Sequence, residues 1–126
     1  MLSRMKHLRM HISDSSKGPI DFGPPWGLHM KIEDAQEMMR EVYWDRDKKR
    51  GVKGTLQRTR EELVELGDAI LEMEGSKEIE EEIADVFAWL CSLANLLDID
   101  VADAFYNKYP DACSKCKQNP CACPDK

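Results

Sequence analysis

The chain has 126 residues and a formal net charge of −6 at pH 7. This length suits one domain with a buried core, and a composition of 42% hydrophobic and 33% charged residues argues against global disorder. The longest uncharged stretch, Val86 to Leu97, has twelve residues, whereas a membrane span needs about 20. The sequence therefore predicts a globular domain with no membrane partner.

Positive and negative charges are unevenly distributed along the chain. Residues 1–31 contain five Lys/Arg and two Asp/Glu, whereas residues 32–126 contain 13 and 22. Because binding to nucleic acid requires lysine and arginine against the phosphates, the acidic body makes nucleic acid an unlikely partner. It leaves open the binding of an anion through bridging metal ions.

Cysteine usage indicates the cellular compartment. Four of the five cysteines fall within the last 14 residues, which is unlike a disulfide framework spread over a small secreted fold. The N-terminus has no apolar core of a signal peptide. Both features favour a cytoplasmic location.

Residues 1–27 are predicted to form an irregular basic segment. Gly18-Pro19 and Gly23-Pro24-Pro25 interrupt any regular element there. The first 13 residues lack acids, as in some targeting peptides, but a mobile tail is the simpler interpretation.

Residues 28–110 are predicted to form an all-α domain. Helical spacing of apolar residues and the absence of sustained strand alternation support this class. Lys48-Lys49-Arg50-Gly51 should end the first helix, and Thr55 and Asp100 are the expected N-caps of later ones. The four expected helices are Ile32–Asp47, Thr55–Glu74, Lys77–Leu97 and Val101–Tyr109.

Two pairs of acids do not fit a solvated helix face. On a helical wheel, Glu62 lies at the edge of an apolar stripe and Glu65 follows one turn later. Glu82 and Asp85 share a face with Trp89, and no further charge appears before Asp98. Such carboxylates must be protonated, paired or bound to metal.

Two interpretations of these pairs remain open from spacing alone. Four carboxylates on neighbouring helices would form an all-oxygen site that suits Mg²⁺ or Mn²⁺. The alternative is a structural acid network with lysine or arginine partners. Zinc or di-iron is disfavoured at this place because His7, His11 and His29 all precede the helices.

The pattern Glu61-Glu62-x-x-Glu65, sixteen further residues and then Glu82-x-x-Asp85 resembles the signature of the MazG-type nucleotide pyrophosphohydrolases. The likeness covers about Ile32 to Pro110 and includes the Lys108-Tyr109-Pro110 segment. It implies a four-helix, MazG-like bundle that assembles as an obligate oligomer, a homodimer or a dimer of dimers. It also implies hydrolysis of a nucleoside triphosphate to the monophosphate and pyrophosphate.

The same resemblance assigns roles to residues. Glu62, Glu65, Glu82 and Asp85 would ligate Mg²⁺ or Mn²⁺, and Glu61 or Glu65 would serve as the general base. Lys108 would hold a phosphate, unless it is an ordinary solvent-exposed lysine, and Trp89 would stack on the base unless it is a core residue. The substrate-binding candidates are Lys108, Lys53, Trp44 and Trp89.

Two alternatives to a general triphosphate hydrolase stay open. One keeps the enzyme but narrows it to dUTP or dCTP, or to phosphoribosyl-ATP. The other is a non-catalytic helical dimer that presents a zinc knuckle as an interaction module.

Residues 111–126 form a separate cysteine-rich tail. Cys113-x-x-Cys116 and Cys121-x-Cys123 make a compact group of four thiols, which suits tetrahedral structural zinc. A redox-active Cys-x-x-Cys or a disulfide-linked tail is the alternative. Cys91, in the middle of the third expected helix, is predicted to be a core residue.

Overall fold

The computed structural model describes residues 29–125, which contain three helices and no strand. They are α2 (Ile32–Leu71), α3 (Ser76–Leu96) and α4 (Val101–Lys108). The all-α prediction is confirmed for these residues, and the segment 1–27 lies outside them. None of the helices described is long and apolar enough to cross a membrane.

The first two expected helices form one kinked element, α2. Its backbone leaves helical geometry at Gly51, where φ is 82° and ψ is 172°. Glycine reaches this region without the steric cost that a Cβ imposes. The predicted helix end therefore falls on a bend rather than on a loop, and three helical elements take the place of four.

The expected N-cap role of Thr55 is wrong. Thr55 lies inside α2, is fully buried, and its Oγ1 accepts a hydrogen bond of 3.2 Å from Arg50 Nη1. The other expected cap is confirmed, because the Asp100 side chain accepts a hydrogen bond from Asp103 N at the start of α4.

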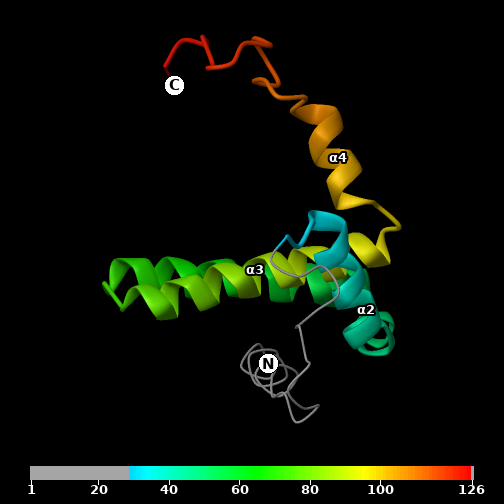
Figure 1. Ribbon diagram of the computed structural model, residues 1–126. Coiled ribbons are helices and arrows are strands. Elements are labelled where there is room, and N and C mark those ends of the chain that lie inside the picture. Colours follow the sequence, from blue (N-terminus) through cyan, green and yellow to red (C-terminus); the bar gives the residue numbers. More distant parts are fainter. Residues whose placement is uncertain (1–28, 126) are drawn as a thin grey trace, which may run out of the picture.

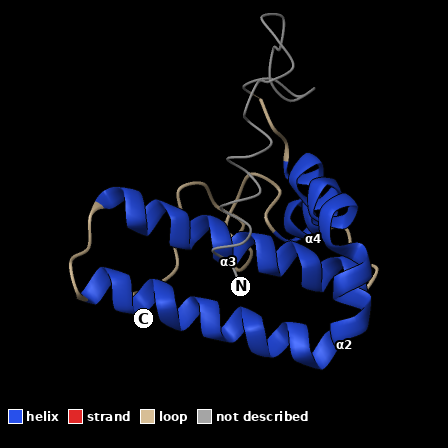
Figure 2. Cartoon of the chain, turned by 90° about the horizontal axis from the view of Figure 1, so that it is seen from below, coloured by secondary structure: helices blue, strands red, loops and turns tan. Residues whose placement is uncertain are grey.

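The part of α2 after the kink runs antiparallel to α3, and the two form a helical hairpin (Figure 2). Residues 72–75 connect them, with Gly75 as the residue before α3. Trp89 and Ala88 of α3 form a small buried cluster against which Met39 and Tyr43 pack. Cys91 is fully buried, as predicted for a core residue.

A buried amide pair fixes the part of α2 before the kink against the end of α3. Gln36 Nε2 donates to Asn95 Oδ1 at 2.9 Å and to the Ile99 carbonyl at 2.8 Å. Asn95 Nδ2 donates back to the Gln36 carbonyl at 3.2 Å. Gln36 Oε1 accepts from Val101 N, so one side chain also holds the start of α4.

The short helix α4 projects away from the α2–α3 hairpin and carries the C-terminal tail (Figure 1). It has no buried residue, and Phe105 and Tyr106 are more than half exposed. Its placement against α2 therefore depends on the hydrogen bond from Val101 N to Gln36 Oε1 more than on packing, whereas Asp100 caps the helix itself.

Candidate active site

Three carboxylates from two helices meet in the hairpin. Glu62 comes from α2, and Glu82 and Asp85 come from α3. One oxygen of each lies within 4.8 Å of the others. Glu62 and Asp85 are each only 1% exposed. The structure thus brings together three of the four expected metal ligands.

Glu65, the fourth expected ligand, is exposed and stands outside this group of three. It lies one helical turn after Glu62, and its charge helps to raise the pKa of Glu62. Glu65 is therefore at the solvent side of the carboxylate group rather than within it.

The ionisation of Glu62 is strongly perturbed. Burial, followed by repulsion from Glu65, raises its pKa to about 7, while the charge of Arg58 acts in the opposite direction. Arg58 Nη2 lies 3.3 Å from Glu62 Oε2. The other oxygen, Oε1, is buried and accepts no hydrogen bond within the described part of the chain. That oxygen is available to a cation.

Glu61 is more exposed and has different partners. Its Oε2 accepts a 3.0 Å hydrogen bond from Gln57 Nε2, and its Oε1 is paired with Arg58. The hydrogen bond from Gln57 and the charge of Arg58 lower the pKa of Glu61. Glu61 therefore stays ionised beside Glu62, with both oxygens engaged.

Arginine residues cover the indole of Trp89 behind the carboxylates. The guanidinium of Arg50 lies 4.5 Å from the ring centroid, and that of Arg58 lies 5.4 Å from it. Trp89 is 5% exposed. Stacking of a nucleotide base on Trp89 would require these guanidinium groups to move.

Asp47 and Arg58 were not singled out from the sequence. Asp47 is 1% exposed and pairs at 2.9 Å with Arg50, the residue just before the kink. Asp47 and Arg58 both lie in charge-rich stretches of the kind that usually form solvated helix surface. The bend at Gly51 lies next to Arg50, the partner of Asp47. The guanidinium groups of Arg50 and Arg58 both lie over the indole of Trp89.

The remaining substrate-binding candidates are not gathered at the carboxylates. Lys53 is exposed on α2. Trp44 is partly buried beneath Arg40, whose guanidinium lies 4.2 Å from the ring centroid. Lys108 is exposed at the end of α4, with its Nζ 5.9 Å from the centroid of Tyr109.

The four tail cysteines form a second group of possible ligands. Their sulfur atoms all lie within 4.8 Å of one another. Backbone N–H groups of Cys116 and Lys115 lower the pKa of the Cys113 thiol to about 6. The neighbouring sulfur atoms raise the pKa of Cys123 to about 12.

Acidic side chains from both helices of the hairpin converge on one point. This arrangement defines the class of helical proteins with an all-oxygen, carboxylate-lined centre. The model of the MazG nucleotide pyrophosphohydrolase domain matches residues 50–117, more than half of the chain. The chain therefore belongs to the MazG nucleotide pyrophosphohydrolase domain family. No curated protein and no solved structure matches it significantly.

The matched range begins at the kink of α2 and contains the whole α2–α3 hairpin and α4. It includes Cys113 and Cys116 but ends before Cys121 and Cys123. The complete cysteine group is therefore not accounted for by the family match.

Proposed function

We propose that the protein hydrolyses nucleoside triphosphates to the monophosphate and pyrophosphate with Mg²⁺ or Mn²⁺. The observation that carries this proposal is the meeting of Glu62, Glu82 and Asp85 across two helices, with two of the three carboxylates buried. Membership of the MazG nucleotide pyrophosphohydrolase domain family supports the reaction type.

The donor set fits a hard divalent cation. All the converging atoms are carboxylate oxygens, the ligands that Mg²⁺ and Mn²⁺ prefer. Glu62 Oε1 is buried and has no hydrogen-bond donor within residues 29–125, a costly arrangement unless a cation or proton binds there. We propose Glu62, Glu82 and Asp85 as ligands, with Glu65 completing the set from the solvent side.

The divalent ions would neutralise the triphosphate and lower the pKa of the attacking water. Between the two candidate bases, the hydrogen bonding favours Glu65. Both Glu61 oxygens are engaged, by Gln57 and Arg58, whereas Glu65 is exposed next to Glu62. Arg58 pairs with the carboxylates of Glu61 and Glu62 and so orients both side chains beside the proposed metal centre.

We further propose that the protein works as a homodimer or a dimer of dimers. The hairpin leaves large apolar side chains in solvent, with Leu63, Val64 and Ile83 each more than half exposed. Burying such a surface against a second copy is favourable at about 25 cal/mol per Å². A second copy could also supply Lys108 to a phosphate, since α4 projects away from the α2–α3 hairpin of its own chain (Figure 1).

A cytoplasmic location is part of the same proposal. Nucleotides are available there, and reducing conditions keep thiols free.

The test is a substrate panel on the purified full chain with detection of pyrophosphate. The panel contains the common nucleoside triphosphates, dUTP, dCTP and phosphoribosyl-ATP, each with Mg²⁺, with Mn²⁺ or with a chelator. We expect metal-dependent release of pyrophosphate from at least one substrate. Release from none of them in the presence of metal would refute the proposed reaction.

A matched pair of variants tests the centre itself. Asp85→Asn should abolish turnover while the helical circular dichroism signal is retained. Asp68→Asn, the same change at an exposed acid of α2, should leave turnover unchanged. Full activity in Asp85→Asn would show that the ligand assignment is wrong.

A further inference from the structure

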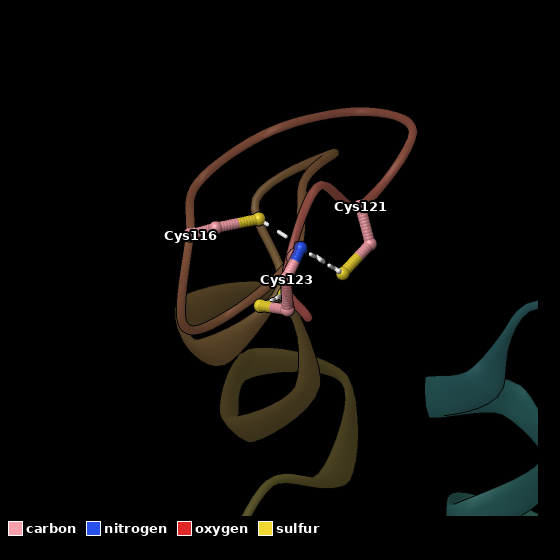
Figure 3. A group of neighbouring side chains, drawn as sticks. Cys116, Cys121 and Cys123 are labelled. Atoms are coloured by element: carbon pink, nitrogen blue, oxygen red, sulfur yellow. Dashed lines mark hydrogen bonds between the residues drawn. The ribbon is translucent and has the colours of Figure 1, made fainter. Parts of the chain in front are cut away.

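The tail beyond α4 brings four sulfur atoms together in a way that neither the carboxylate centre nor the proposed hydrolysis requires. Cys113, Cys116, Cys121 and Cys123 lie within eleven residues, and all their sulfur atoms fall within 4.8 Å of one another. Figure 3 shows Cys116, Cys121 and Cys123 turning toward a common centre in the loop that follows α4.

The sulfur separations match a metal tetrahedron. Cys113 Sγ lies 3.8 Å from Cys123 Sγ, and Cys116 Sγ lies 3.9 Å from Cys121 Sγ. With Zn–S bonds of about 2.3 Å, the edge of an ideal tetrahedron is about 3.8 Å. A disulfide would require about 2.05 Å, so the sulfurs are arranged as ligands rather than as bonded pairs.

The backbone of the tail is folded around these sulfurs. Cys113 N donates to the Gln118 carbonyl, and Lys117 N donates to the Cys113 carbonyl, each at 3.0 Å. Lys117 has a φ of 62°, which turns the chain back after Cys116. The first two cysteines are thus held on one closed turn.

Backbone N–H groups also point at the sulfur atoms. Cys123 N donates to Cys121 Sγ at 3.3 Å (Figure 3). Ala122 N donates to Cys116 Sγ at 3.3 Å, and Lys115 N lies 3.4 Å from Cys113 Sγ. Such bonds stabilise thiolates around a metal and orient them.

We infer that the four cysteines bind one zinc ion in a closed structural site. Binding replaces the four thiol protons, which leave to solvent, and no oxidation is involved. Four protein sulfurs leave no open coordination position, so the site is not catalytic. Soft thiolates select zinc here, whereas the hard carboxylates of the hairpin select Mg²⁺ or Mn²⁺, so one chain would hold two different metals.

The role of the zinc would be to order the tail. Residues 109–125 contain no helix or strand, and all of their side chains are at least partly exposed. A segment without a core can gain its folding free energy from a structural metal instead. Because only residues 109–112 separate α4 from Cys113, the zinc would also restrain the chain just beyond that helix, whose last residue is Lys108.

The experiment measures metal bound to the full chain, independently of turnover. Protein purified under reducing conditions from zinc-supplemented cells should contain about one zinc per chain by elemental analysis. Replacement by Co²⁺ should give the sulfur-to-metal absorption bands of a tetrahedral thiolate site. Cys116→Ser and Cys121→Ser should each lose most of the zinc and these bands.

Cys91→Ala is the control, because Cys91 is buried in α3 away from the cluster and should leave the zinc content unchanged. Zinc-free wild-type protein that also fails to give the Co²⁺ bands would overturn the inference. So would a mass four hydrogens lower than that of the reduced chain in freshly purified protein, which would indicate two disulfides. Equal zinc in Cys116→Ser, Cys121→Ser and wild type would also overturn it.

Discussion

Arg58 binds Glu62 one helical turn later, with 3.3 Å between Nη2 and Oε2, while its Nη1 binds Glu61. One guanidinium thus pairs with two carboxylates, one of them buried and one partly exposed. Its other neighbour is the indole of Trp89, 5.4 Å from the guanidinium carbon. Arg58 therefore links the core of the hairpin to the edge of the candidate active site.

Arg58→Gln should lower the free energy of unfolding of the metal-free protein by about 1 kcal/mol at pH 8. The ion pair is partly exposed and contributes modestly, but its removal leaves Glu62 buried and ionised without a partner. The loss should shrink at pH 5, where Glu62 is protonated. Urea unfolding at both pH values measures this. Arg60→Gln, at an exposed position on the same helix, is the control. Equal losses at the two pH values would contradict the pairing of Arg58 with an ionising Glu62.

The raised pKa of Glu62 predicts the pH dependence of stability without metal. The folded-state pKa is about 7, against an ordinary value of 4.5, so between these values the native state binds more protons than the unfolded state. The contribution of Glu62 to stability is thus present below about pH 4.5 and lost as the pH rises to about 7. Unfolding free energies measured with a chelator across this range should show the decline.

Glu62→Gln should remove this decline, because glutamine does not titrate. Glu74→Gln, at an exposed acid beyond the end of α2, should leave it unchanged. If the slope in Glu62→Gln equals that of the wild type, another group is responsible for it.

The sequence was sufficient to find the hairpin and most of the carboxylate group, for a clear physical reason. An i,i+3 spacing places Glu82 and Asp85 on one face, and the uncharged run after Asp85 shows that this face is buried. The sequence could not show that the Glu65 side chain stays in solvent, because a helical wheel does not say where the neighbouring helix lies. Asp47 escaped notice because a charge-rich stretch of helix is normally solvated, and Arg58 because a wheel does not show its contact with Trp89 of the neighbouring helix.

The pairing of Gln36 with Asn95 was equally hidden, because the two lie 59 residues apart and each is an ordinary polar residue in its own helix. Asn95→Ala should lower the free energy of unfolding by about 1–3 kcal/mol, because it leaves the backbone carbonyl of Gln36 and part of the Gln36 side-chain amide buried without partners. Chemical denaturation measures the loss. Asn107→Ala, on the exposed face of α4, should change stability little. A small effect at both positions would show that the amide pair does not hold α2 against α3.

Two glycines of α2 should respond to alanine with opposite signs. A Cβ added at Gly51 or at Gly67 would meet no atom within 4 Å, so steric contact does not separate them. The backbone does: Gly51 has a φ of 82°, which an alanine tolerates poorly, at a cost of about 1–3 kcal/mol. Gly67 lies in regular helix, where alanine should stabilise by about 0.5–1 kcal/mol.

Thermal and urea unfolding of Gly51→Ala and Gly67→Ala compare the two directly. Because Arg50, next to the kink, lies over the ring of Trp89, Gly51→Ala should also disturb the indole and change its fluorescence. Gly67→Ala should leave the fluorescence unchanged. If Gly51→Ala stabilised the protein as Gly67→Ala does, α2 would pass through residue 51 as straight helix, and the placement of Arg50 over Trp89 would be wrong.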